Sequence, residues 1–421
     1  MKLHSKILLA LAGGIAVGVL VRVVDVPALT TALVALEPFG RAWIRLITMI
    51  VVPLVVSTLF MATASLGDVR KLAGLGGRTL GYFVVTTVIA ATIGMGAALL
   101  VRPGIGLEPG AGAELAVDVA AGPPEAAASA AGRSLGEVVV EMVPRNPLAA
   151  AAQMDLLPLI VSVLIFGAAA NLIAAERRQT LIDFFSAVND LCMVIVGWVM
   201  KLAPYAVFIL IATMTVRFGT DLLGRLLVYS LVVVGALAIH VGGILAPALA
   251  FLAKVNPLAF LRRVGEAPLL AFSTASSNAT LPVSMTVAEQ RLGISERVTS
   301  FVLPAAATLN MNGGAVYKAV TAVFLAQVYG LSLDAGQQAT IVATASLAAI
   351  AGVGVPSSSL VTTLIVLNAI GLGDQAAIGI ALVAGLEGIL DRFRTSVNVI
   401  GDLTCVAYVA RCEGEELKLA D

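Results

Sequence analysis

Apolar and polar residues are distributed differently in the two halves of the chain. In the first half, long apolar runs of about the length that spans a bilayer are separated by short charged stretches. These runs lie near residues 7–24, 40–65, 80–101, 154–173, 186–215 and 226–253. Beyond about residue 255, clusters of Ser, Thr, Asn, Gly and Pro interrupt the apolar stretches. The pattern predicts an all-α polytopic membrane protein whose second half is built differently from its first.

The composition supports a membrane protein. Of 421 residues, 59% are hydrophobic and only 12% are charged, whereas about 25% of the residues of soluble domains are charged. This difference excludes a disordered chain and argues against a soluble enzyme. Lys and Arg together number 26, as do Asp and Glu, so no excess of basic charge indicates a nucleic-acid partner. The three cysteines and two histidines form no motif for a metal site.

The loop charges predict the orientation of the chain. Basic residues gather at the N-terminus and in every second loop, namely at Lys2, Lys6, Arg70, Lys71, Arg78, Arg177, Arg178, Lys254, Arg262 and Arg263. The loop 103–135 is instead rich in Ala, Gly and Pro and carries acidic residues. Because Lys and Arg prefer the cytoplasmic side, we expect a multi-pass protein of the cell inner (plasma) membrane. Both termini would lie in the cytoplasm, and 103–135 would be a flexible external loop.

Two polar clusters in the second half predict re-entrant hairpins. The first runs from Ser273 to Pro282 between short apolar arms, and the second, rich in Gly and Ser, runs from Ala349 to Ser359. Neither stretch holds an uninterrupted apolar span of about 20 residues. Polar side chains at such a tip can satisfy the free backbone groups of a hairpin that enters the membrane and turns back. A hairpin followed by an interrupted helix, repeated twice, is typical of inverted-repeat transporters; the alternative is two loops on the membrane surface.

The last apolar segment carries a stripe of ionisable and polar side chains. Glu387, Asp391, Arg394, Asn398 and Asp402 are spaced so that they share one helix face about 80° wide. Ionisable groups at membrane depth are costly and usually face a cavity, so they mark a functional site. The alternative is an internal ion pair, for example between Asp391 and Arg394, and the two interpretations can coexist.

The chemistry of this stripe suits a zwitterionic acid. The Arg394 guanidinium offers a planar fork of donors for a carboxylate, and Asp391 offers a carboxylate for an ammonium group. Backbone N–H groups and hydroxyls at the hairpin tips suit a second carboxylate. Together these groups predict a dicarboxylic amino acid as the substrate. The oxygen atoms of Asn310, Asn398 and Asp402 suit a hard cation such as Na⁺.

Several motifs occur in a fixed order along nearly the whole chain. They are Met49–Leu54, Val143–Pro147, Ser276–Pro282, Asn310–Gly313, Gly352–Pro356 and Asp391–Asp402. Together they resemble the glutamate/aspartate transporter family, the dicarboxylate/amino acid:cation symporters. The resemblance implies eight transmembrane helices and two re-entrant helical hairpins in a homotrimer that works as an elevator.

The resemblance also implies a static scaffold and a mobile transport domain. Scaffold helices 1 and 2 are expected within 1–65 and scaffold helices 4 and 5 within 136–218. Helix 3 of the transport domain is expected at 78–102, and the rest of this domain at 222–421. After helix 6, its parts are hairpin 1 at about 257–292, helix 7 at about 297–330, hairpin 2 at about 335–370 and helix 8 at about 374–411.

Residue roles also follow from the resemblance. It implies that Asp391 holds the substrate amino group and Arg394 its side-chain carboxylate, while the hairpin tips, at Ser277 and around Val355, receive the main carboxylate. The second hairpin would act as the gate. The other implied substrate-site residues are Thr395, Asn398, Ser276, Asn278, Pro356, Gly314 and Met311.

Departures from the family pattern affect the expected ion coupling. Asn312 replaces a carboxylate that helps to bind one Na⁺ in sodium-coupled relatives, although Thr86 and Thr87 of that site are present. Gly314 replaces a threonine that touches the substrate, and Lys318 replaces a neutral residue further along the same face. The coupling ion is therefore left open between H⁺ and Na⁺, with Na⁺ coupling reduced or absent. The remaining candidates for ion coupling are Asn310, Asp402, Thr308, Glu387 and Arg392, the last also implied to lie near the substrate.

Lys318 admits two hypotheses. Its ammonium group could stand in for a bound Na⁺, for example by neutralising Asp402. Alternatively, burial could make it titratable and link transport to protons. A lysine that snorkels towards water is the simplest interpretation.

The sequence thus predicts a secondary active symporter that imports L-glutamate or L-aspartate, with no cofactor besides the coupling ion. A C4-dicarboxylate such as succinate, malate or fumarate is the alternative substrate, although Asp391 would repel it. A neutral amino acid would leave Arg394 unpaired. An intramembrane hydrolase would lack a plausible base, since His4 is terminal and His240 lies in an apolar helix, so no enzyme is expected. A passive anion channel could not concentrate its substrate.

Overall fold

The structure is a computed structural model that describes residues 3–64, 74–105, 140, 143–153, 156–218, 221–350 and 358–418. The regular elements within these ranges are helices, so the predicted all-α class is confirmed for this part of the chain. Most of the expected external loop, and the tip of the second hairpin with Val355 and Pro356, lie outside the described residues.

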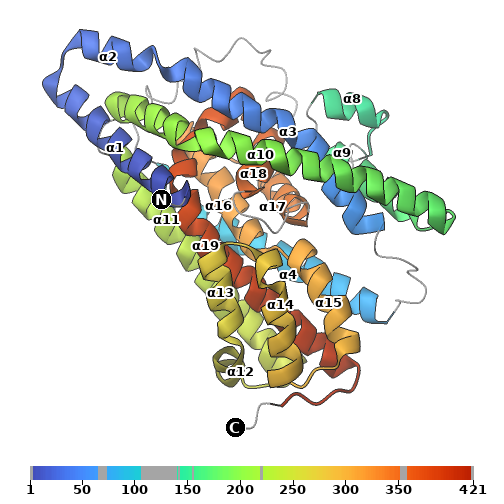
Figure 1. Cartoon of the computed structure of the whole chain (residues 1–421). Helices are drawn as coiled ribbons and strands as arrows, with labels where there is room; N and C mark the ends of the chain where they lie inside the picture. The colour runs from blue at the N-terminus through green and yellow to red at the C-terminus, as the bar shows by residue number, and fades with distance from the viewer. Residues whose placement is uncertain are drawn as a thin grey trace.

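One group of helices surrounds the long helix α10. Its members are α1 (Leu3–Val24), α2 (Pro27–Val34), α3 (Glu37–Ala64), α8 (Pro147–Ala152), α9 (Leu156–Ala170) and α10 (Ala175–Phe218). Helices α1 and α3 both lie along α10, and α9 packs on α3 (Figure 1). A Cβ at Gly14 of α1 would lie only 2.8 Å from the Phe208 carbonyl of α10. Small residues therefore let these two backbones approach closely.

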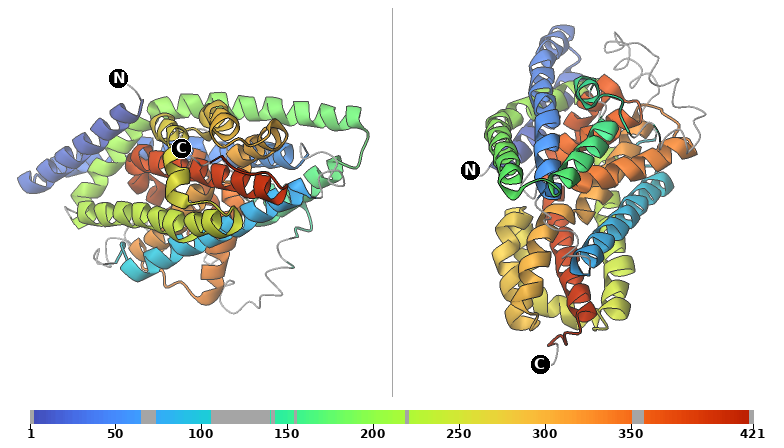
Figure 2. Two further views of the ribbon diagram at one scale, coloured as in Figure 1. Left: turned by 90° about the horizontal axis from the view of Figure 1, so that it is seen from below. Right: turned by 90° about the vertical axis from the view of Figure 1, so that its right-hand side faces the viewer.

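The second group holds the remaining helices. They are α4 (Leu75–Val101), α11 (Asp221–His240), the π-helical turns η1 (Val241–Leu245) and η2 (Ala248–Leu252), α12 (Pro257–Val264), α13 (Glu266–Thr274), α14 (Ser277–Thr286), η3 (Val287–Arg291), α15 (Glu296–Leu309), α16 (Asn312–Val328), α17 (Ala335–Ile350), α18 (Ser358–Ala369) and α19 (Gly373–Cys412). The first group lies at one end of the molecule, and α12–α15 with the C-terminus lie at the other (Figures 1 and 2).

Helix α16 is the centre of the second group. It packs against α4, α11, α17, α18 and α19, and nearly all of its side chains are buried. Because the helix is covered on all sides, its sequence shows no apolar stripe. A Cβ at Gly94 of α4 would lie 2.6 Å from the Val316 carbonyl of α16, and one at Gly313 would collide with the Arg394 backbone of α19. Both glycines thus permit contacts that place α16 beside the polar face of α19.

Two antiparallel helix pairs and one broken helix occupy the second half of the chain. In the first pair, α13 and α14 turn at Ala275, whose φ of 52° is left-handed, and the Ser276 hydroxyl caps α14 by accepting from the Ala279 N–H at 3.2 Å. The second pair is α17 and α18, which pack on each other. Helices α15 and α16 meet at Asn310 and Met311, where the helical backbone is interrupted.

The helix lengths bear on the membrane spans. Among the described residues, Leu75–Val101, Ala175–Val199 and Gly224–Leu252 are long and apolar enough to cross a membrane by length and composition. The apolar run expected at 186–215 is part of the single 44-residue helix α10. The count of eight spanning helices and the scaffold and transport roles of the two groups stay predictions.

Candidate functional site

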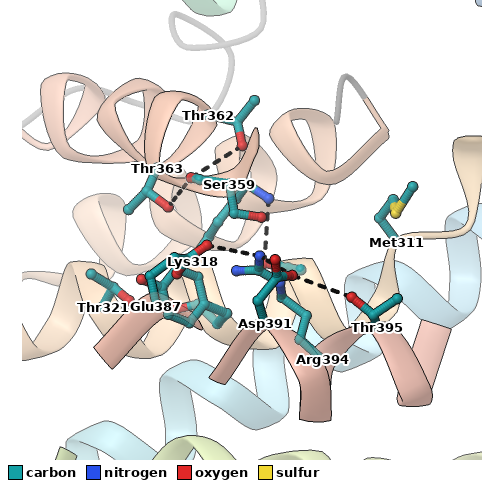
Figure 3. Close-up of polar contacts among 12 residues, drawn as sticks. Met311, Lys318, Thr321, Ser359, Thr362, Thr363, Glu387, Asp391, Arg394 and Thr395 are labelled. Atoms are coloured by element: carbon teal, nitrogen blue, oxygen red, sulfur yellow. Dashed lines mark hydrogen bonds and ion pairs between the residues drawn. The ribbon is translucent and has the colours of Figure 1, made fainter. Parts of the chain in front are cut away.

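The polar stripe of α19 faces the interior of the second helix group. Helix α19 packs against α16, α18 and both helices of the first hairpin, and Figure 3 shows Glu387, Asp391 and Arg394 near Lys318 and Ser359. The side chains of the stripe are all nearly inaccessible, with residue exposures between 2% and 5%, namely Glu387, Asp391, Arg394, Thr395, Asn398 and Asp402. The stripe is therefore covered by protein in this structure.

The Arg394 guanidinium joins the charges at one end of the stripe. Its Nη2 donates to Glu387 Oε1 at 2.8 Å and to Asp391 Oδ1 at 2.6 Å, and Asp391 Oδ1 also accepts from the Thr395 hydroxyl at 3.2 Å. The guanidinium carbon lies 4.8 Å from the ring centroid of Tyr317 in α16, a cation–π distance. The internal ion pair that the sequence left open is thus present, and it includes a second carboxylate.

The same cluster retains hydrogen-bonding capacity. Arg394 Nη1, Glu387 Oε2 and the Tyr317 hydroxyl are buried and have no hydrogen-bond partner among the described residues. Buried polar groups are usually hydrogen-bonded. A donor and an acceptor beside the paired charges are what a bound zwitterion would use.

Lys318 belongs to this cluster. It is 1% exposed, and it interacts electrostatically with Arg394, Glu387 and Asp391 (Figure 3). The structure thus does not place it to neutralise Asp402, the first of the two hypotheses drawn from the sequence. The physical reason is the direction of α16, since Asn310, which contacts Asp402, lies about two turns away from Lys318. The burial also disagrees with a lysine that snorkels to water.

The first hairpin brings its tip to α19. The Ser277 hydroxyl is buried and lacks a hydrogen-bond partner among the described residues. Arg392 Nη1 donates to the carbonyls of Phe272 and Ser273 at 2.9 Å each, at the end of α13. Arg392 therefore anchors the hairpin arm to α19. Asn278 is exposed and does not join the buried cluster.

The interruption between α15 and α16 lies at the other end of the stripe. Asn310 Nδ2 donates to Asp402 Oδ1 at 2.9 Å, while Asn310 Oδ1 is buried without a partner among the described residues. Asn398 Oδ1 accepts from the Gly313 N–H at 2.8 Å, and its Nδ2 contacts Met311 Sδ at 3.2 Å. A carboxylate and an unpaired amide oxygen fit a hard cation at this place.

The second candidate ion site has different chemistry. Thr87 donates to Asn312 Oδ1 at 2.8 Å, and the Thr86 hydroxyl lies 3.5 Å from the same oxygen. The Asn312 Nδ2 donor group is buried without a partner among the described residues. An amide carries no negative charge, and it presents a donor group that has no partner here, so this place suits a cation less well than one that holds a carboxylate. The Thr308 hydroxyl donates to the Pro304 carbonyl of its own helix at 3.4 Å, and its part in ion coupling stays a prediction.

The sequence did not predict two residues that lie near the cluster. Tyr317 was not predicted because α16 is buried on every side, so no polar face of this helix distinguishes it. Ser359 of α18 belongs to the serine-rich stretch noted in the sequence but was not assigned a site, and Figure 3 shows it above Asp391 and Arg394.

A buried charge cluster beside an interrupted helix and a helical hairpin is typical of secondary transporters. The chain matches the sodium:dicarboxylate symporter family over residues 3–412. It therefore belongs to this family, and the family resemblance seen in the sequence is confirmed.

Curated relatives agree with this assignment. The chain is 31% identical over 380 residues to a proton/sodium-glutamate symport protein of Bacillus caldotenax, covering 90% of this chain and 88% of the relative. It is 32% identical to a proton/glutamate-aspartate symporter of Escherichia coli (strain K12), with coverages of 90% and 85%. Excitatory amino acid transporter 2 of Homo sapiens is 32% identical, with coverages of 91% and 74%.

Proposed function

We propose that this protein is a secondary active symporter that imports acidic amino acids, L-glutamate or L-aspartate. The observation that carries the proposal is the buried cluster in which Arg394 pairs with both Glu387 and Asp391. The names of the similar symporters support the substrate class and coupling by H⁺ or Na⁺.

Substrate binding is an exchange of ion-pair partners. The substrate ammonium takes the place of Arg394 at Asp391, and the substrate side-chain carboxylate takes the freed donors of Arg394. Each charge then keeps a partner throughout, which avoids the large cost of an unpaired buried charge. Ser277, Thr395 and Asn398 hold the rest of the amino acid.

The proposal for the coupling ion rests on the two candidate ion sites, one at Asp402 and one at Asn312. Asp402 with Asn310 and Asn398 would hold one Na⁺, because oxygen atoms converge there. The place around Asn312 would hold none. We therefore propose that Na⁺ coupling is reduced to at most one ion, and that H⁺ contributes to coupling.

The larger arrangement is proposed on loop charges and family membership. The protein lies in the inner (plasma) membrane with both termini in the cytoplasm, and it forms a homotrimer. The first helix group is the scaffold. The second group moves across the membrane with the substrate, and the second hairpin opens and closes the site.

Uptake into proteoliposomes tests the function. Purified protein is reconstituted, and labelled glutamate and aspartate are offered under an inward Na⁺ gradient, an inward H⁺ gradient, both, or neither. Accumulation above the external concentration under at least one gradient is expected. Equilibration without accumulation would indicate a channel and contradict the proposal.

The alternative substrate is a C4-dicarboxylate, which the family name favours. The two substrates are separated by Asp391→Asn. Because Asp391 is the partner of an ammonium group, the variant is expected to lose aspartate uptake far more than succinate uptake. Equal losses would refute the role of Asp391.

A further inference from the structure

The Lys318 ammonium group lies beside Gly314. A Cβ placed on Gly314 would lie 3.3 Å from Lys318 Nζ, which is tighter than an ordinary van der Waals contact. Any larger side chain at 314 would compete with the ammonium group for its position. Gly314 therefore leaves the ammonium group more room beside the cluster of Glu387, Asp391 and Arg394 than a larger residue would.

The Lys318 ammonium group has spare hydrogen-bonding capacity. An ammonium group has three donors, and among the described residues Lys318 Nζ donates only to the Gly314 carbonyl, at 3.5 Å. At 1% exposure water does not reach it freely. A buried cation with so few partners is suited to an anion that is supplied from outside the chain.

The charge balance points to the same anion. Glu387 and Asp391 contribute two negative charges, and Arg394 and Lys318 contribute two positive charges. An acidic amino acid adds two carboxylates and one ammonium group. With Lys318 the loaded cluster carries one net negative charge, and without it the cluster would carry two. Lys318 thus lowers the cost of placing a second carboxylate next to Glu387.

We propose that Lys318 is a substrate-binding residue, whose ammonium group beside Gly314 shares the distal carboxylate of the acidic amino acid with Arg394. The inference rests on the proposed function, since it assigns the selectivity for an acidic side chain to this residue. A neutral analogue such as asparagine or glutamine gains nothing from the second cation.

Competition between matched substrates tests the inference. Uptake of labelled aspartate by Lys318→Met is measured against unlabelled aspartate and asparagine, with Lys318→Arg as the control that keeps the charge. We expect Lys318→Met to raise the KM for aspartate by about tenfold or more with little change in kcat. The preference for aspartate over asparagine should fall by the same factor, and Lys318→Arg should keep most of it. An unchanged preference in Lys318→Met would overturn the inference.

A second pair of variants covers a failure of Lys318→Met to fold. Gly314→Thr should displace the ammonium group and weaken aspartate binding, although Lys318 is still present. The double variant Gly314→Thr/Lys318→Gln should bind aspartate more tightly than Gly314→Thr, because the crowded ammonium group is removed. Size-exclusion profiles and melting temperatures report folding for each variant. Additive losses in the double variant would contradict the inference, whereas wild-type protein that takes up no acidic amino acid would refute the proposed function itself.

Discussion

The two ends of the buried face of α19 differ in their chemistry. At one end, Arg394 pairs with Glu387 and Asp391 at 2.8 and 2.6 Å. At the other, Asp402 is a single carboxylate that accepts from the neutral amide of Asn310 at 2.9 Å. Charges of both signs can exchange partners with a zwitterion, whereas a lone carboxylate beside amide oxygens suits a small cation. In the proposed function, one helix face therefore carries a substrate end and an ion end about two turns apart.

The largest effect is expected from Arg394→Ala, which removes the guanidinium group from the substrate end. It leaves two buried carboxylates without their guanidinium, and breaking such a buried pair costs about 3–5 kcal/mol. Uptake of aspartate should fall by about a hundredfold or more, and the melting temperature should drop. Arg392→Gln is the control on the same helix, because Arg392 lies outside the buried cluster and donates to carbonyls of the hairpin. A larger loss of uptake in the control would reverse the assignment.

The next largest effect is expected from a variant that tests cation binding near the ion end. Asn312→Asp places a carboxylate beside Thr86 and Thr87, and an uncompensated buried charge is strongly destabilising. We expect a lower melting temperature in KCl and a recovery of a few degrees in NaCl, since a ligand that binds the folded state stabilises it. The wild type should show a smaller difference between the two salts. A variant with no preference for NaCl would show that this place cannot hold a cation.

A smaller effect is expected from Glu387→Gln, which should improve substrate binding instead of weakening it. The change removes one of the two carboxylates that compete with the substrate for Arg394. The KM for aspartate should therefore fall by several-fold, about the range of one hydrogen bond to a charged group. Asp391→Asn is the matched control, and its KM should rise because the ammonium group loses its partner. Similar increases in both variants would mean that the two carboxylates play the same part.

The smallest effect is expected from a substitution far from both ends of the buried face of α19. Glu413, just after α19, pairs with Arg78 of α4 at 2.9 Å and with Arg297 of α15 at 2.6 Å. These arginines are exposed, so Glu413→Gln should lower stability by no more than about 1 kcal/mol and leave the KM unchanged. High salt should remove the difference from wild type. Glu416→Gln is the control, because Glu416 is exposed and makes no ion pair among the described residues. A change in KM would indicate that the C-terminal segment reaches the site.

Much of the local structure could be predicted from the sequence. The polar cluster beginning at Ser273 lies at the turn between α13 and α14, and the residues Asn310 and Met311 interrupt a helix. The spacing of Glu387, Asp391 and Arg394 placed them on one face. Each of these features depends on helix periodicity and on the partners that backbone groups need in an apolar surrounding, and both act over a few residues.

The sequence by itself determined an all-helical membrane chain with a charged stripe and two interrupted apolar regions, because local periodicity and composition decide these features. Only the tertiary structure decided that Arg394 holds two carboxylates and that Lys318 lies with them rather than with Asp402. Those choices depend on how α16 is rotated and positioned against α19, which close contacts at Gly94 and Gly313 set across long distances in the chain.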